Sequence, residues 1–448
     1  MIKRVICVLI AAFMFIGLVA CGSNSSENTD ESSVQPSAQP TEKPELKPAE
    51  MKGEISFWHF NKDEGPKIVE AFNKVYPNIK VNLTIVPDKD QNYINKITAA
   101  IRSGSGVPDV FSGESAFVRK LVEMEGAYAD ISDRVKPLQD DIVKYTLEVG
   151  TDVNGKIKAL SHQITAGGLA YKKPVAKKYL GTDDPEKIAE MLSTPEKCIE
   201  TAKTLKEKSG GKVSLFPVWE EPYKMFLGSR ATGWVKDNKL VIDPKMSDFI
   251  DYAKQLNETG GEAGLQQWNP PWAAAIGDDE TAMCWAVPTW GVPWIVGSND
   301  KKAADGGRWG LVKAPLEYFW GGTWYGIYAK SEKQDLAWEF IKWFTTDKDH
   351  LREWSKSTGD IPSSLSLLEE GSKSSDVDKI MGINLYKFYV PFVNNINGGI
   401  FTQYDSAIEQ VYTDTMRSYL AGKLNSKEDF LKQFKETVKT NLKDIEVN

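Results

Sequence analysis

Residues 54–85 read EISFWHFNKDEGPKIVEAFNKVYPNIKVNLTI, a strand-like segment, an amphipathic helical segment and a second strand-like segment. The pattern continues with another helical segment and another short apolar run. The strands are expected at 54–57, 79–85 and 108–111, and the helices at 66–76 and 93–102. This β-α-β-α-β order indicates an open, mostly parallel sheet with helices on both faces.

Ligands of such sheets bind beyond the carboxyl ends of the strands. The segments that follow the first and third strands therefore share one edge, and each carries polar or aromatic side chains. The candidate ligand contacts at this edge are Trp58, Phe60, Asn61 and Glu114. An alternative is that Trp58 belongs to the core, while Phe60 and Asn61 make the contacts.

The 448-residue chain is longer than one hydrophobic core usually serves, so two lobes are expected. Beyond residue 160 we expect strands at 166–171, 214–219 and 320–329, helices at 174–179, 185–192, 194–208, 249–257 and 336–344, and a mostly helical tail from Asn384. The chain would cross between the lobes near Leu160, Gly322 and Ser375. The expected N-lobe comprises 52–160 and 324–376, and the expected C-lobe comprises 161–323 and 377–448.

The first twenty-one residues resemble a bacterial lipoprotein signal peptide. Lys3 and Arg4 precede an apolar run that is too short to span a membrane, and the run ends in Leu-Val-Ala-Cys at 18–21. The resemblance implies a signal peptide at 1–20 and a lipid on Cys21, which would anchor the protein at the extracellular face of the cell membrane. Residues 21–50 are rich in Ser, Pro, Asn and Glu, which predicts a disordered tether. The alternative is an ordinary secreted protein.

Charge and metal-ligand content argue against several functions. The net charge is −7 and the chain has no block of Lys and Arg, so nucleic acid is not an expected partner. The three histidines are not in a metal-ligand spacing, and neither a metal nor another cofactor is expected. Cys198 and Cys284 are the two cysteines of the expected body; they could form a disulfide or remain buried thiols.

Aromatic residues are abundant, with 14 Trp, 16 Tyr and 18 Phe. Tryptophan offers a flat apolar surface with one polar group. Sugar rings stack on such surfaces through their C–H faces, while carboxylates and amides bind their hydroxyls. The composition therefore favours a carbohydrate ligand, although each Trp is equally compatible with an aromatic core.

Several short motifs occur in a fixed order along the chain. They are Ile55-Ser56-Phe57-Trp58, Ser105-Gly106-Val107-Pro108-Asp109-Val110, Gly126-Ala127-Tyr128-Ala129-Asp130-Ile131, Gly168-Leu169-Ala170-Tyr171, Glu280-Thr281-Ala282-Met283 and Gly321-Gly322-Thr323-Trp324-Tyr325-Gly326-Ile327. With these motifs the chain from Glu54 onward resembles the family 1 extracellular solute-binding proteins, the carbohydrate receptors of ABC importers, and more distantly maltose-binding protein.

The resemblance implies a two-lobed, type II periplasmic-binding-protein-like α/β fold, with a mostly parallel sheet in each lobe and a hinge between the lobes. It also implies a non-catalytic monomer that closes on a carbohydrate and delivers it to ABC transporter permease subunits. The number of aromatic candidates favours an oligosaccharide over a monosaccharide.

The resemblance also suggests binding residues in the later part of the chain. Glu221-Pro222-Tyr223 matches a tripeptide that supplies a carboxylate and a stacking ring in maltose-binding protein, and charged acceptors bind hydroxyls strongly. The alternative is a strand-end turn with an exposed Glu221. Trp290 lies near a stacking Trp of the family, with Trp285 and Trp294 as rivals.

Three further regions are candidates by the same resemblance. Thr165 stands where maltose-binding protein has an acidic ligand residue, so the chain departs from the pattern there. Trp320, Trp324 and Tyr325 flank a glycine pair that would let a ring approach the backbone. Phe401 and Tyr404 are candidates from the last crossing.

Two other functions remain open from the sequence. An exported glycoside hydrolase would need two carboxylates at a defined separation. The adjacent pairs Glu220-Glu221 and Asp278-Asp279 are candidates, but adjacent acids on a strand point apart. The same fold could also bind a non-sugar solute.

Overall fold

A computed structural model of the protein describes residues 47–448. The expected signal peptide 1–20, the lipidation site Cys21 and most of the expected tether 21–50 lie outside the described residues. The described chain begins with the exposed turn η1 (Pro48–Glu50) and then enters the first strand. No helix among residues 47–448 is both long and apolar enough to cross a lipid bilayer.

The N-terminal lobe is built on a five-stranded sheet with the strand order β2-β1-β3-β11-β4. Its strands are β1 (Gly53–His59), β2 (Ile79–Ile85), β3 (Val110–Glu114), β4 (Ala159–Ser161) and β11 (Thr323–Ile327). β1 pairs in parallel with β2 and β3, while β11 runs antiparallel to β3 and β4. The expected β-α-β-α-β order is confirmed, with the third strand beginning two residues later than expected.

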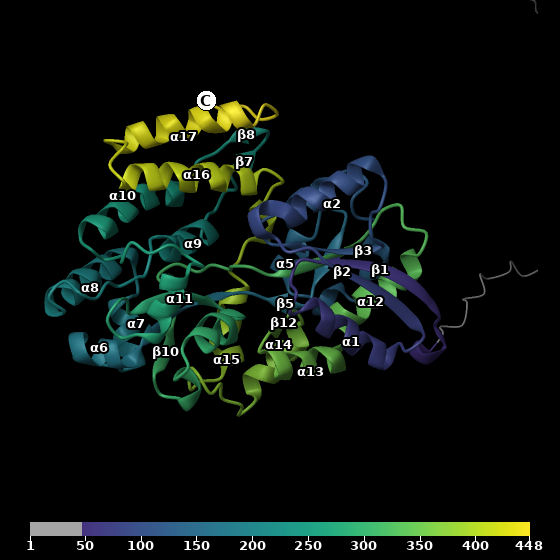
Figure 1. Cartoon of the computed structure of the whole chain (residues 1–448), viewed down its shortest axis with the longest axis horizontal. Helices are drawn as coiled ribbons and strands as arrows, with labels where there is room; N and C mark the ends of the chain where they lie inside the picture. Colours follow the sequence, from purple (N-terminus) through teal and green to yellow (C-terminus); the bar gives the residue numbers. More distant parts are fainter. Residues whose placement is uncertain (1–46) are drawn as a thin grey trace, which may run out of the picture. The chain divides into compact units, whose positions relative to one another are not determined.

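Helices cover both faces of this sheet (Figure 1). They are α1 (Gly65–Val75), α2 (Asn92–Ser103), α3 (Val118–Glu123), α4 (Ser132–Val135), α5 (Lys144–Val149), α12 (Gln334–Thr346) and α13 (Lys348–Thr358). α1 buries Ile68 and Phe72, and the Phe72 ring lies 4.9 Å from Phe340 and 5.4 Å from Trp343 on α12. Burial of each such side chain stabilises the fold by about 1.5–3 kcal/mol, which explains why the apolar stripe of α1 faces the core.

The sheet of the C-terminal lobe differs from the expectation. Its strands β6 (Gly167–Lys172), β9 (Cys284–Pro288) and β10 (Trp309–Val312) pair antiparallel in the order β10-β6-β9. The mostly parallel sheet expected for this lobe is therefore corrected. The chain leaves β6 at Lys172 and returns to the same end of the sheet at Cys284, so β9 must run back against β6.

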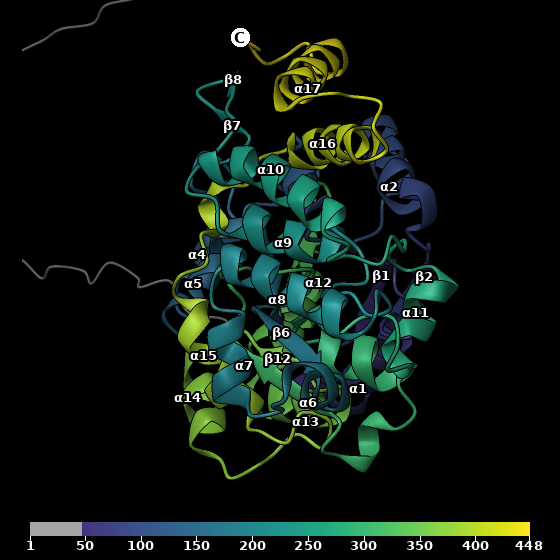
Figure 2. The same cartoon turned by 90° about the vertical axis from the view of Figure 1, so that its left-hand side faces the viewer.

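Helices make up most of the C-terminal lobe. They are α6 (Lys173–Leu180), α7 (Pro185–Met191), α8 (Pro195–Lys208), α9 (Glu220–Gly228), α10 (Pro244–Glu258), α11 (Pro270–Gly277), α15 (Leu385–Val393), α16 (Asp405–Leu420) and α17 (Lys427–Asn441). The strand expected at 214–219 is reduced to isolated bridges at Ser214 and Phe216. α16 packs between α10 and α17, as both views show (Figures 1 and 2).

Two short strands form a further small sheet. β5 (Gln163–Ile164) follows β4 directly and pairs antiparallel with β12 (Ile361–Pro362), which leads into α14 (Leu365–Lys373). The segment that follows the first expected crossing, near Leu160, thus lies beside residues 361–362. The exact lobe boundaries given above remain a prediction.

Cys198 and Cys284 are both free thiols buried in the core of the C-terminal lobe. Burial raises the pKa of each thiol. This answers the question that the sequence left open.

Candidate ligand-binding cleft

A cavity of about 340 Å³ is lined by residues of both lobes. Its lining comprises Phe60, Asn61, Glu64, Lys67, Glu114, Gln163, Trp268, Trp290, Trp294, Gly321, Gly322, Thr323, Trp354, Thr358 and Asp360. We call it the aromatic cavity. The lining from the N-terminal lobe includes Phe60 and Asn61, which follow β1. This confirms that the edge of the sheet beyond the carboxyl end of β1 faces a cavity.

Tryptophans of the C-terminal lobe form one wall of the aromatic cavity. Trp268 and Trp290 lie nearly parallel, with ring centroids 6.3 Å apart. Trp320 lies 5.1 Å from Trp290 and 5.7 Å from Trp268, and the buried Trp272 supports Trp268 at 5.1 Å. Trp268 is 58% exposed, so the cluster offers a broad ring surface to the cavity.

Gly321 allows this wall to form. Its φ of +77° lies in the left-handed region, and a Cβ at this position would stand 2.7 Å from Nε1 of Trp290. The Nε1–H of Trp290 donates to the Trp320 carbonyl at 2.7 Å. Glycine is therefore required both for the backbone conformation and for the close approach of the indole.

Buried titratable groups contact Glu64 and Asp360, two carboxylates that line the aromatic cavity. His162 Nε2 lies 3.7 Å from a Glu64 oxygen and 3.5 Å from an Asp360 oxygen, and the hydroxyl of Tyr325 donates to Glu64 at 3.3 Å. His59 Nδ1 accepts from the Asn61 amide at 2.9 Å, so its neutral ring carries the proton on Nε2, which faces Glu64 at 3.6 Å.

These environments separate the acidities of the groups. Burial raises the pKa of Glu64 to about 7 and lowers the pKa of His59 to about 3. Burial would also raise the pKa of Asp360, but His162 and the Nε1–H of Trp354 hold that pKa below its usual value. The carboxylates of Glu64 and Asp360 thus line the cavity while already contacting His162, Tyr325 and Trp354.

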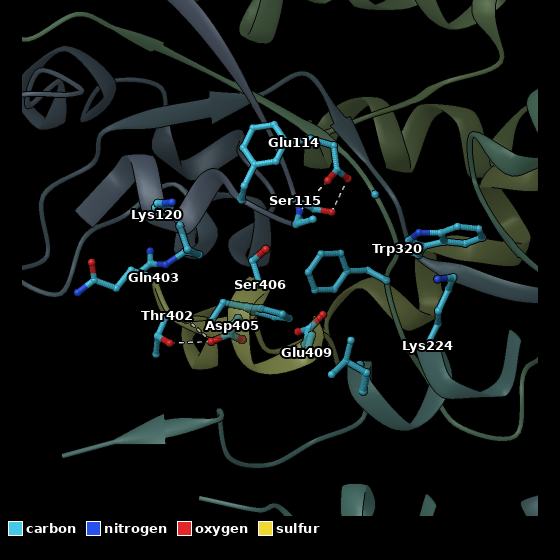
Figure 3. A pocket seen from close by; sticks show the side chains of 18 of the residues that line it. Glu114, Ser115, Lys120, Lys224, Trp320, Thr402, Gln403, Asp405, Ser406 and Glu409 are labelled. Atoms are coloured by element: carbon cyan, nitrogen blue, oxygen red, sulfur yellow. Dashed lines mark hydrogen bonds between the residues drawn. The ribbon is translucent and has the colours of Figure 1, made fainter. Parts of the chain in front are cut away.

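A second cavity of about 200 Å³ adjoins the first, because Glu114 and Gly321 line both. Figure 3 shows Glu114 on one side, Lys224 and Trp320 together, and Asp405 and Glu409 from the start of α16. The Lys224 ammonium lies 4.1 Å from the centroid of the Trp320 ring. We call this the charged cavity; burial raises the pKa values of Glu114 and Glu409 and lowers that of Lys224.

Glu221 lies elsewhere than the sequence suggested. It sits in the first turn of α9 and is fully buried, so neither a ligand-facing carboxylate nor an exposed strand-end turn describes it. Its oxygens accept from the Nε1–H of Trp272 at 2.9 Å and the amide of Ala286 at 2.9 Å. The apolar residues before Glu221 continue into a helix rather than ending a strand, which turns this side chain inward.

The other expected residues divide into two groups. Phe60, Asn61, Glu114 and Trp290 line the aromatic cavity, as does the rival Trp294, and Tyr223 lines the charged cavity with Trp320 and Phe401. The second group lines neither cavity and comprises Trp58, Thr165, Trp285, Trp324, Tyr325 and Tyr404.

Most of the residues in the second group have partners elsewhere. Trp285 and Trp324 are fully buried core side chains; the former lies 4.5 Å under the Lys172 ammonium, and the latter donates to the Thr146 carbonyl. Thr165 donates to the Gly321 carbonyl at 3.0 Å. Trp58 is half-buried against an apolar cluster of the N-terminal lobe, with the Lys96 ammonium 5.0 Å from its ring.

The two remaining residues fall just outside the cavities. The buried Tyr325 reaches the cavity only through its hydrogen bond to Glu64. Tyr404 precedes α16 and is half-buried, while Thr402 and Gln403 beside it line the charged cavity.

Sequence reasoning missed Trp268, Glu64, Asp360 and Lys224. A signal for Trp268 exists, since Gln266-Gln267-Trp268-Asn269 stands directly before the Pro-Pro pair that begins α11. A large aromatic residue among amides in a loop is typical of a ligand contact. The carboxylates carry no such signal, because nothing local distinguishes them from surface acids.

Comparisons with known proteins agree with this architecture. Residues 67–380, more than half of the chain, match the model of a family described as bacterial extracellular solute-binding protein. The chain belongs to this family. The two-lobed α/β fold class expected for this solute-binding protein is confirmed by solved structures of similar proteins.

One relative is the arabinooligosaccharide-binding protein of Halalkalibacterium halodurans, which is 20% identical over 87% of this chain and 89% of its own. A similar structure is the galacto-N-biose/lacto-N-biose I-binding protein of Bifidobacterium longum, with a TM-score of 0.71 and 20% identity over 89% of this chain and 99% of that one. Another is an ABC-transporter-associated binding protein of B. animalis subsp. lactis in complex with β-1,6-galactobiose, with a TM-score of 0.68 and 19% identity over 87% and 98% of the two chains.

These relatives are named for binding, not for catalysis. In the part of this solute-binding protein that the structure describes, no three His, Cys, Asp or Glu side chains are grouped to hold a metal ion.

Proposed function

We propose that this solute-binding protein captures a carbohydrate, specifically an oligosaccharide, between its lobes and delivers it to the permease of an ABC transporter. The observation that carries the proposal is the aromatic cavity, whose lining combines four tryptophans with the carboxylates of Glu64 and Asp360. Sugar rings stack on indoles, and carboxylates accept their hydroxyl protons in charge-assisted hydrogen bonds. The binding proteins named above for oligosaccharides and disaccharides support the same ligand class.

We assign separate roles to the two cavities. Trp268 and Trp290 stack on sugar rings, and Asn61, Glu64 and Glu114 bind hydroxyls. The charged cavity, reached past Glu114, accepts a further unit of the chain. Two adjoining cavities of different chemistry favour a ligand of more than one ring.

We also propose the cellular setting. A lipid on Cys21 holds the protein as a monomer at the extracellular face of the cell membrane, and residues 21–50 give it reach. A globular body held at the membrane can then close on its ligand and dock on the permease.

Titration calorimetry with arabino-oligosaccharides, lacto-N-biose and β-1,6-galactobiose tests the ligand class. We expect saturable binding of at least one oligosaccharide, weaker binding of its component monosaccharide, and recovery of the glycan intact. No binding across the panel would move the proposal to a non-sugar solute, and recovery of shortened glycan would establish a glycoside hydrolase instead.

Two single substitutions test the site. Trp290→Ala removes a cavity wall and should weaken binding by about 10–100-fold, the usual cost of truncating a buried aromatic anchor. Trp58→Ala removes a tryptophan of the N-terminal lobe that lies outside both cavities, so the affinity should stay within about twofold of the unmodified protein. Equal losses in the two variants would contradict the assignment of the aromatic cavity.

A further inference from the structure

Glu221 receives three hydrogen bonds from two separate segments. Oε1 accepts from the Nε1–H of Trp272 at 2.9 Å and from the side-chain amide of Gln267 at 3.3 Å. Oε2 accepts from the main-chain amide of Ala286 at 2.9 Å. The carboxylate is fully buried, so these donors replace the water that it would otherwise require.

Two of the three donors flank, in sequence, a tryptophan that lines the aromatic cavity. Gln267 and Trp272 lie on either side of Trp268 in sequence, and Ala286 lies in β9, the strand that leads to Trp290. Glu221 therefore joins the loop that carries one cavity tryptophan to the strand that positions another.

Trp268 needs such support because its own backbone does not favour its position. Its φ is +68°, a left-handed conformation that is uncommon for a bulky residue and costs about 1–3 kcal/mol. Its side chain is 58% exposed, so burial of the ring contributes little to holding it. A strained, exposed aromatic residue persists only where neighbouring contacts fix the loop.

The structure assigns Glu221 as a positioning residue that holds the segment 267–272, the end of a loop and the start of α11, so that Trp268 is already placed at the cavity before the ligand arrives. The inference rests on the proposed sugar binding for its functional consequence, but not for its structural part. Glu221 acts through Trp268 and does not touch the ligand. An ordered platform binds more tightly because the loop loses less conformational entropy on binding.

The chemistry of the carboxylate fits this role. All three partners are donors, so an acceptor-only group is required. Burial raises the pKa of Glu221 to about 7, whereas the Trp272 and Ala286 donors favour the charged form. Replacement by glutamine retains the volume but puts an N–H group opposite one of the donors.

A double-mutant cycle tests whether Glu221 acts through Trp268. The variants are Glu221→Gln, Trp268→Ala and their combination, and the readout is the Kd of whichever of arabino-oligosaccharide, lacto-N-biose and β-1,6-galactobiose binds most tightly. Trp294→Ala supplies the matched background, since Trp294 lines the same cavity without a bond to the loop. Coupled residues give non-additive effects, while independent ones add.

We expect Glu221→Gln to weaken binding about tenfold in the unmodified protein and in the Trp294→Ala background, but less than about twofold in the Trp268→Ala background. A loss of similar size in all three backgrounds would overturn the inference, because Glu221 would then act on the ligand or on the whole fold. No loss in the unmodified protein would overturn it as well.

Hydrogen exchange without ligand tests the positioning by itself. Glu221→Gln should speed the exchange of amides in 265–272 and leave those of α12 in the other lobe unchanged. Unchanged exchange in 265–272 would overturn the inference even if sugars bind. If no sugar binds the unmodified protein, the proposed function fails while this exchange result still decides the role of Glu221.

Trp272→Phe provides a second variant if Glu221→Gln does not fold. It removes the Nε1–H donor, keeps the ring beside Trp268 and leaves the carboxylate in place. Faster exchange in 265–272 is expected again, and normal exchange would count against the inference.

Discussion

Substitution of Gly321 by alanine tests how the tryptophan wall is built. The left-handed φ of +77° costs an alanine about 1 kcal/mol. The added Cβ would also stand 2.7 Å from Trp290 Nε1 and 3.1 Å from Cε2, so the indole must move. Its movement breaks the hydrogen bond to the Trp320 carbonyl, for about 1 kcal/mol more. We expect Gly321→Ala to lower the free energy of unfolding by about 2 kcal/mol.

Gly307→Ala is the matched control. Gly307 has a similar φ of +73°, but no atom lies within 4 Å of the position that an alanine Cβ would occupy there. Alanine at this site should cost about 1 kcal/mol for the backbone alone. The difference between the two variants therefore measures the contact with Trp290.

Urea denaturation gives the stabilities, and titration calorimetry with the best-binding oligosaccharide gives the affinities. Gly321→Ala should weaken binding by about tenfold because Trp290 leaves its place, whereas Gly307→Ala should leave the affinity unchanged. Equal losses of stability together with equal affinities would refute the reasoning that Gly321 sets the position of Trp290.

The remaining predictions concern acid stability and the thiols. Burial lowers the pKa of His350 to about 3 in the folded protein. Below pH 6.5 this histidine is therefore protonated in the unfolded chain but remains neutral in the folded protein. The free energy of unfolding consequently falls as the pH falls. His350→Phe keeps the ring packing on Trp343 at 3.8 Å; its stability relative to the unmodified protein, measured by urea denaturation, should rise by about 2 kcal/mol between pH 7.5 and pH 5, and no change would refute the assignment. In the chain from residue 47, Cys198 and Cys284 should resist a thiol reagent in the folded state and both react after unfolding without reductant; recovery of no thiol would show a disulfide.

The N-terminal lobe could be predicted from local patterns. The helical period of 66–76 reflects a face that buries Ile68 and Phe72, and the alternation of 79–85 reflects a face on which Ile79 is buried and Val81 and Leu83 are half-buried. The sheet of the C-terminal lobe could not be predicted in this way. Tyr171 pairs with Cys284, more than a hundred residues further along the chain, and the residues of neither strand indicate whether the two strands pair parallel or antiparallel.

The binding residues show a similar division. Phe60 and Asn61 could be predicted because they follow a recognisable strand, and the position after a strand predicts the edge of the sheet. The expectation for Glu221 was wrong because a match of three residues identifies the residue types but does not predict whether each side chain is buried. Its orientation depends on Trp272 and Ala286, which lie 51 and 65 residues further along the chain.

The aromatic residues explain why residue type alone does not identify a binding surface. Trp324 and Tyr325 are neighbours in β11, so their side chains point to opposite faces of the sheet. Both are buried, because separate apolar clusters cover the two faces. Trp268 and Trp290 instead lie outside the strands, in segments held by indole hydrogen bonds, from Trp272 to Glu221 and from Trp290 to the Trp320 carbonyl. In a sheet covered on both faces an aromatic strand residue packs against the core, and the four tryptophans that line the aromatic cavity accordingly lie outside the strands.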